Sequence, residues 1–121
     1  MVACPKPPKP EPEPEHVRRV AQLPCCCTLH RFNVDPHHLI RDPDGGHCAG
    51  RRSGGKWTVP LRADLHRGGN KSLHFGPLDE PEFFAQYGVD QIAVARKLWA
   101  LTEAGLRREA WLEAGRKVIE G

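Results

Sequence analysis

The stretch DPHHLI, at residues 35–40, sets two histidines between an Asp-Pro step and two apolar residues. Three more histidines follow along the chain, at His47, His66 and His74. Adjacent residues at the end of a strand point to opposite sides, so one imidazole can bind a metal ion while its neighbour faces a substrate. A hydrolytic metal site needs both a ligand for the ion and a separate base that takes a proton from water. The pair therefore raises the question of whether these histidines converge on one site.

The length, composition and charge limit the size of the core and the kinds of partner that the chain can have. The chain has 121 residues, enough for one domain, and only 39% of them are hydrophobic and 7% aromatic. Such a chain has a small core, and chains of this kind often need a metal ion or a partner for stability. The net charge of +3 permits nucleic-acid binding without arguing strongly for it.

The number of cysteines and the hydropathy of the chain indicate in which cellular compartment the protein lies. There are five cysteines, which is an odd number, and no apolar run follows the N-terminal methionine. No stretch approaches transmembrane length, so we expect no contact with a membrane. We predict a reducing, cytoplasmic setting, in which the cysteines are free thiols or metal ligands rather than a disulfide framework.

The chain divides into three parts. Residues 1–15 contain PKPPKPEPEPE, in which alternating proline and charge predict a disordered, solvated leader; a docking role is the alternative. We expect an ordered core over 16–78 and C-terminal helices over 79–121 that pack on it. The predicted fold class is α+β.

Local patterns predict the elements of the core and of the helical part. In the core we expect a short helix or strand at 16–23, a strand at 30–34, another after the histidine pair, a basic mobile loop at 41–56 and a strand at 57–61 stopped by Pro60. A short helix interrupted by Gly68-Gly69, or a helix that starts after them, should follow. The helical part should contain a helix capped by Asp79 and ended by Gly88, and one or two helices to residue 120 with a break at Gly105.

Two further ligands are expected from the short helix. His66 and His74 are eight residues apart, close to two helical turns, but Gly68-Gly69 makes an unbroken helix between them doubtful. A small insert that loops out would bring the two together. Asn70 falls inside this insert, where we interpret it as a turn residue beside two glycines. Spacing alone leaves open whether the histidines share a site or are scattered.

From His16 to about Leu101 the chain resembles the small phage and prophage HNH-type nucleases, especially the recombination-enhancement (Ref-like) group. The resemblance is carried by HVRRVAQLPCC, DPHHLI, two glycines in the loop, WTVPL, LHRGG followed by LH, and EFFAQYGVDQIAVARKLW. It implies a ββα-metal (His-Me finger) core and a metal-dependent endonuclease that hydrolyses phosphodiester bonds in DNA, for recombination or DNA processing. For this group it also implies a recombinase filament as a partner that holds the DNA.

The resemblance also implies roles for particular residues. His37 would be a metal ligand, His38 the general base, and His66 and His74 ligands from the helix, while Asp35 would position the histidine pair or its water. The implied ion is Mg²⁺ or Mn²⁺, with Zn²⁺ as an alternative at the histidine site or at a structural site. The residues implied to contact backbone phosphates are Arg41, Arg51, Arg52 and Lys56.

The chain departs from the family pattern at its cysteines. Thr28 stands where a second cysteine of a Cys-x-x-Cys pair would fall, and Arg62 replaces the cysteine of Val-Pro-Leu-Cys. A zinc site with four cysteines cannot be assembled in the usual way. A substitute structural metal site would draw on Cys25 or Cys27, Cys48, His30 and His47. The alternative is that the cysteines are small buried apolar residues.

Three functions therefore stay open. The first is the active endonuclease, and the second is a catalytically degenerate nucleic-acid-binding or adaptor protein of the same fold. The third is a small helical protein with an incidental histidine loop. The sequence leaves the oligomeric state and the preference for sequence or strand open.

Overall fold

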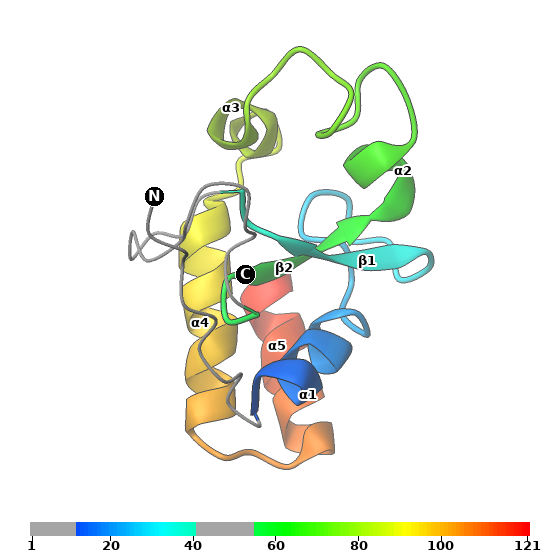
Figure 1. The fold of residues 1–121 in the computed structure, drawn as a ribbon. Helices are drawn as coiled ribbons and strands as arrows, with labels where there is room; N and C mark the ends of the chain where they lie inside the picture. The colour runs from blue at the N-terminus through cyan, green and yellow to red at the C-terminus, as the bar shows by residue number, and fades with distance from the viewer. Residues whose placement is uncertain (1–11, 41–54) are drawn as a thin grey trace, which may run out of the picture.

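The computed structural model describes residues 12–40 and 55–121, and within them the fold is α+β (Figure 1). It contains five helices and a hairpin of two antiparallel strands. The elements are α1 (Pro12–Val20), β1 (Val34–His38), β2 (Thr58–Arg62), α2 (Ala63–Arg67), α3 (Glu80–Ala85), α4 (Gln91–Glu103) and α5 (Arg108–Glu120). No helix in this described part is long and apolar enough to cross a membrane.

The register of the hairpin places two prolines opposite each other. Pro36 pairs with Pro60, and His37 pairs with Val59 on the next rung. Proline has no N–H, so this pair fits only at a rung where the backbone polar groups point away from the partner strand. The outward carbonyl of Pro60 instead accepts the N–H of Cys26 at 2.9 Å. The hairpin therefore runs through both prolines without losing a ladder hydrogen bond.

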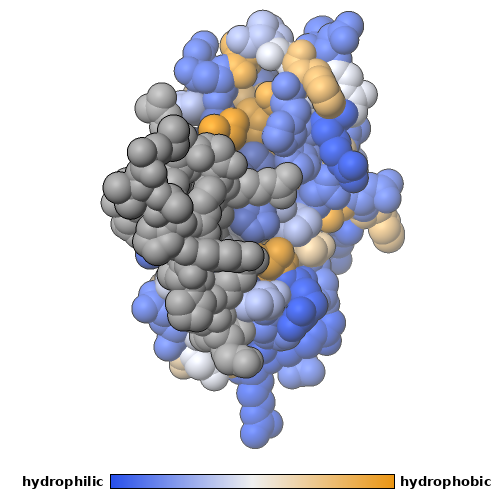
Figure 2. Space-filling model, viewed as in Figure 1, coloured by the Kyte–Doolittle hydropathy of each residue, from blue (hydrophilic) through white to orange (hydrophobic). Residues whose placement is uncertain are grey.

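Two packed clusters hold the elements together. The larger cluster lies at the hairpin and joins Val59 and Leu61 to Phe83 and Phe84 of α3 and Ala95 of α4. The smaller cluster lies between α1, α4 and α5, which run side by side in Figure 1. Much of the surface in Figure 2 is hydrophilic, with small apolar areas between the charged side chains. The core is small, as the composition predicts, and it fixes the hairpin against α3 and α4.

The expected C-terminal helices are confirmed. The carboxylate of Asp79 accepts the N–H of Glu82 at 3.0 Å and caps α3. The chain leaves α3 at Gly88, with φ of 71°, and leaves α4 at Gly105, with φ of 72°. Both angles lie in the left-handed region that glycine adopts readily, so the breaks fall where the sequence predicts them.

Several boundaries differ from the expectation. Helix α1 begins at Pro12, so residues 12–15 of the expected leader are helical, and residues 1–11 lie outside the described part. The expected strand at 30–34 is wrong, because β1 begins at Val34 and contains the histidine pair. Pro60 does not stop the second strand, because β2 continues to Arg62.

Candidate metal centre

Three histidines converge beside the hairpin. The Nδ1 atom of His37 on β1 lies 3.2 Å from Nε2 of His66 on α2. Nε2 of His74, in the turns after α2, lies 3.0 Å from the same atom of His66. One ligand nitrogen from each of the three lies within 4.8 Å of the other two. Among the described residues this is the group that could hold a metal ion, and it contains the three ligands that the sequence predicts.

The backbone brings His74 to His66 although the helix between them ends. Helix α2 stops at Arg67, so the expectation that His74 extends from that helix is wrong. The expectation of an insert that loops out is confirmed: the N–H of Leu73 donates to the carbonyl of Leu65 at 2.7 Å. The N–H of His74 donates in the same way to the carbonyl of His66, at 3.1 Å. The two imidazoles are therefore positioned by paired backbone hydrogen bonds rather than by helical periodicity.

The tight exit from α2 requires a glycine. A Cβ atom added at Gly68 would lie 2.5 Å from the Cα of Asp64, a distance that real Cβ atoms do not adopt. The same atom added at Gly69 would meet nothing within 4 Å. Only the first of the two adjacent glycines is therefore needed by the path of the chain.

Two of the three histidines each hold one ring nitrogen against a carboxylate oxygen. The Nε2 atom of His37 lies 2.9 Å from a carboxylate oxygen of Glu80, and both side chains are buried. The Nδ1 atom of His66 lies 3.0 Å from Asp35, which also accepts from Nε of Arg67 at 3.2 Å. Such partners fix the tautomer and the orientation of metal-binding imidazoles. Asp35 therefore contacts His66, which lies outside the histidine pair of its own strand.

These contacts with carboxylates determine which ring nitrogens face the middle of the histidine cluster. An ionised carboxylate accepts hydrogen bonds and cannot donate them, so the two outer nitrogens carry the ring hydrogens. In a neutral imidazole the other nitrogen is then a bare lone pair. With both rings neutral, Nδ1 of His37 and Nε2 of His66 would present two lone pairs to each other across 3.2 Å. This arrangement is repulsive without a cation between the rings, and it is the form in which imidazole binds metals.

The electrostatics keep His66 in that form. Burial lowers the pKa of His66, and the neighbouring His37 and Arg67 lower it further, while the hydrogen bond to Asp35 opposes them. The net shift is downward, so this imidazole is neutral at physiological pH. A neutral histidine binds an ion without first releasing a proton.

The spacing of the nitrogens also suits an ion. A tetrahedral ion with metal–nitrogen bonds of about 2.0–2.1 Å needs ligand nitrogens about 3.3 Å apart. The nitrogen of His66 lies 3.2 Å from that of His37 and 3.0 Å from that of His74, close to that length. Three histidines also leave a fourth position open, which is typical of catalytic rather than structural zinc sites. The residues present therefore fit a divalent cation.

The other predicted site residues lie apart from the cluster or outside the described part. Neighbouring residues of a strand face opposite sides, so His38 lies on the other face of β1 from His37, and it is half-buried. Lys56 lies just before β2, with its ammonium 5.4 Å from the centre of the Trp57 ring. The predicted residues that fall outside the described part are Arg41, Arg51, Arg52, Cys48 and His47.

The cysteines in the described part do not form a ligand group. The Sγ atom of Cys25 accepts the N–H groups of Cys27 and Arg62, at 3.4 and 3.3 Å. Contact with Cys27 and burial raise the pKa of Cys25 to about 12, so the thiol stays protonated. The guanidinium of Arg62 pairs with Asp64, with Nη2 and Oδ2 2.7 Å apart, and its Nη1 lies 2.8 Å from His30. Of the residues predicted for the structural metal site, Cys25, Cys27 and His30 lie in the described part, and they do not form a ligand group there.

Glu80 is the site residue that sequence reasoning missed. It follows the N-cap Asp79, where an acidic residue in the first turn of a helix is common and indicates nothing about a ligand. Its side chain is nevertheless buried and also accepts the N–H of Ile40 at 2.9 Å. Nothing in the local sequence distinguishes it from the exposed Glu82.

Comparison with protein-family models, curated proteins and solved structures gives no match for this chain. The functional assignment therefore depends on the geometry of the histidine cluster.

Proposed function

We propose that the chain is a metal-dependent endonuclease of the HNH (ββα-metal) type that hydrolyses phosphodiester bonds in DNA. The observation that carries the proposal is the convergence of His37, His66 and His74, with a carboxylate behind two of them. The order of elements agrees with that assignment, because a hairpin supplies the first ligand and the segment after it supplies the other two.

The proposal gives each residue a separate task. The three imidazoles would hold the ion, and Zn²⁺ suits imidazole nitrogens better than Mg²⁺, which prefers oxygen ligands. A bound divalent ion would supply a Lewis acid for a phosphate oxygen. Asp35 and Glu80 keep the ligand nitrogens aimed at one point. His38 would accept a proton from water, because it neighbours a proposed ligand in sequence but lies outside the ligand group.

A second candidate is a nucleic-acid-binding adaptor that has kept the fold and lost the chemistry. The observation that favours it is the position of His38 on the face of β1 opposite His37. An adaptor of this kind would keep the metal for stability and would not use His38.

A plasmid-nicking assay with Zn²⁺, Mn²⁺ or Mg²⁺ tests both candidates when metal content is measured in the same samples. We expect metal-dependent nicking by the wild type. His37→Ala should lose both metal and nicking, whereas His38→Ala should keep the metal and lose nicking. His30→Ala is the matched control, because this exposed histidine lies outside the cluster, and it should behave as the wild type.

The outcomes separate the candidates. Bound metal without nicking under any of the three ions would overturn the endonuclease and favour the adaptor. A wild-type protein that takes up no divalent ion would overturn both.

A further inference from the structure

Two histidines of the cluster are each followed directly by an exposed side chain that the proposed metal chemistry does not use. Arg67 follows His66, and Phe75 follows His74. The side chain of Arg67 is 65% exposed, and Phe75 is 68% exposed. The backbone hydrogen bonds that join residues 65–66 to residues 73–74 keep both of them beside the cluster. A positive group and an aromatic ring therefore border the same centre.

Arg67 is held by a carboxylate that also contacts the cluster. Its Nε donates to an oxygen of Asp35 at 3.2 Å, and Nδ1 of His66 lies 3.0 Å from the same oxygen. The two terminal nitrogens of the guanidinium make no hydrogen bond within the described part of the chain. A guanidinium presents such donors in a rigid fork that matches the oxygens of a phosphate. Arg67 is therefore positioned to bind an anion close to His66.

Phe75 presents an open aromatic ring beside His74. The centres of the two rings lie 6.5 Å apart, and neither packed cluster of the core includes Phe75. A tight turn fixes its backbone, because the N–H groups of Phe75 and Gly76 donate to the hydroxyl and the carbonyl of Ser72, at 3.3 and 2.7 Å. A Cβ atom added at Gly76 would lie 2.5 Å from that carbonyl oxygen, so the turn needs this glycine. Open rings of this kind are the platforms on which unpaired bases stack.

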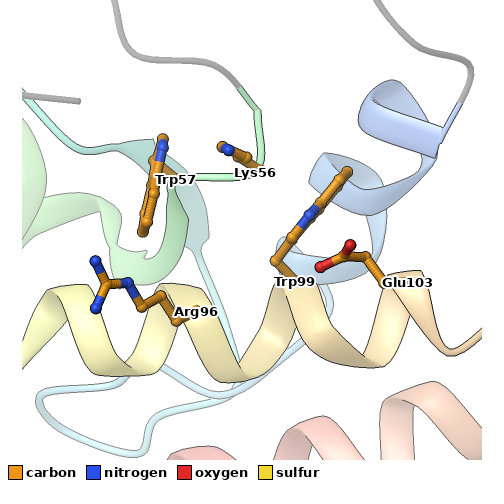
Figure 3. A pocket seen from close by; sticks show the side chains of 5 residues that line it. All are labelled: Lys56, Trp57, Arg96, Trp99 and Glu103. Atoms are coloured by element: carbon orange, nitrogen blue, oxygen red, sulfur yellow. The ribbon is translucent and has the colours of Figure 1, made fainter. Parts of the chain in front are cut away.

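Other aromatic rings of the structure are not open in this way. The pocket of about 270 Å³ between β2 and α4 is lined in part by Trp57 (Figure 3). That ring is only 4% exposed and its N–H is buried, so neither its face nor its donor is open to a ligand. Phe84 lies near the cluster, with its ring centre 6.1 Å from that of His37, but it is fully buried. Phe75 therefore combines an open ring with a place beside the histidines.

We propose that Phe75 is a stacking platform for an unpaired base at the metal centre, and that Arg67 binds a phosphate of the same strand. An unpaired nucleotide fits this surface because it joins a planar ring to an anion. A strand with one phosphate at the ion would place a neighbouring base on Phe75 and a second phosphate on Arg67.

The inference deepens the proposed function, on which it rests for DNA as the ligand. It identifies the substrate as DNA with an unpaired base next to the phosphate that is cut, such as a single strand, a flap or an unpaired loop. In an intact duplex both faces of a base are covered, and removing the base from its stack costs a few kcal/mol. Phe75 would therefore favour unpaired over paired DNA.

Fluorescence anisotropy with a short labelled strand, alone and paired with its complement, tests the platform. Binding is measured in Zn²⁺ and in EDTA, and the length of the strand is checked afterwards. We expect the wild type to bind the single strand more tightly than the duplex. Phe75→Ala should weaken binding of the single strand by about fivefold to 100-fold, the loss of one stacked base, and should change duplex binding little.

Two further variants at the same position separate stacking from general apolar contact. Phe75→Tyr keeps a ring face and should bind as the wild type does. Phe75→Leu keeps apolar surface without a ring face and should bind as Phe75→Ala does. Phe32→Ala is the matched control, because it removes another exposed phenylalanine, and it should leave binding unchanged. Since Phe75 lies outside the core, unchanged thermal melts should show that its variants are folded.

The salt dependence of binding tests Arg67. For a single strand, each lost phosphate contact reduces the slope of log K against log salt concentration by about 0.7. Arg67→Gln should show this reduction, whereas Arg116→Gln, at an exposed position of α5, should keep the slope of the wild type. Bound metal is measured in both variants, because Asp35 contacts His66 as well as Arg67.

Equal affinity of the wild type and Phe75→Ala for the single strand would overturn the inference, as would wild-type binding by Phe75→Leu. An equal loss in Phe75→Ala and Phe32→Ala would also overturn it. A preference for single strands that depends on Phe75, without any nicking, would keep the platform and lose the endonuclease. Nicking by a protein whose binding does not depend on Phe75 would do the reverse.

Discussion

The Nδ1 atom of His37 and the Nε2 atom of His66 lie 3.2 Å apart, and the other nitrogen of each ring lies against a carboxylate oxygen. With both rings neutral, this arrangement leaves two lone pairs in contact, and Nε2 of His74 adds a third nitrogen 3.0 Å from that of His66. A cation relieves this repulsion, so occupancy of the cluster and stability of the fold are linked.

Metal binding should therefore raise the stability of the protein. At 100 times the dissociation constant, Zn²⁺ should add about 2.7 kcal/mol to the free energy of unfolding. For a domain of this size that corresponds to a rise of about 10 °C in Tm. Thermal melts with Zn²⁺ and with EDTA measure it. His74→Ala should abolish the rise, whereas His30→Ala should keep it, and equal rises in both variants would place the ion elsewhere.

Loss of the Glu80 carboxylate should weaken metal binding without removing a ligand. Glu80→Gln leaves an acceptor near the N–H of Ile40 but removes the charge that orients His37. Changes at such outer partners typically lower metal affinity about 10-fold to 100-fold. Competition with a chromogenic zinc chelator gives the affinity. Glu82→Gln, two residues along the same helix and exposed, should leave it unchanged, and an equal loss in both variants would contradict the orienting role.

The two adjacent glycines after α2 should respond differently to the same change. In Gly68→Ala the new methyl group meets the backbone of Asp64, and the resulting shift should reduce the free energy of unfolding by about 1–3 kcal/mol. It should also weaken metal binding, since it disturbs the turn that carries His74. Gly69→Ala places its methyl group in open space and should stay within about 0.5 kcal/mol of the wild type. Urea unfolding of both variants tests the difference.

Stability should fall in mild acid because of His16. Its ring is buried against Trp99 and Trp111, and its Nδ1 lies 2.6 Å from the hydroxyl of Thr102. Burial, with a smaller contribution from the nearby Arg19, lowers the pKa of His16 to about 4 in the folded protein, against 6.5 in the unfolded chain. Between these values the unfolded chain binds the additional proton.

The stability linked to His16 is therefore fully present above pH 6.5 and is lost as the pH falls towards 4. The total loss is on the order of 3 kcal/mol. Denaturant unfolding of metal-free protein from pH 7 to pH 4 measures it, with His16→Leu as the comparison. The wild type and the variant should differ in slope over this range; parallel curves would contradict a neutral His16.

The sequence predicted which histidines lie together better than it predicted the elements that carry them. The resemblance singled out His37, His66 and His74 from the seven histidines of the chain, and these three lie together in the structure. Asp79, Gly88 and Gly105 carry conformational signals that do not depend on tertiary contacts. The start of β1 could not be predicted so well, because pairing with β2 decides it, and Pro36 and Pro60 argue locally against a strand. Glu80 gave no local signal, because its role depends on burial beside a residue 43 positions away.

The backbone hydrogen bonds between Leu65 and Leu73 and between His66 and His74 hold the two ends of the intervening segment together, so that this segment forms a closed loop. The length of that loop has no direct effect on where the two imidazoles lie. Extra residues beyond Gly69 would extend into solvent, so this is a position where a peptide tag or a fluorescent reporter could be inserted with the ligand nitrogens undisturbed. It also means that related sites need not share a fixed number of residues between these two ligands, and that a search built on constant spacing would overlook them.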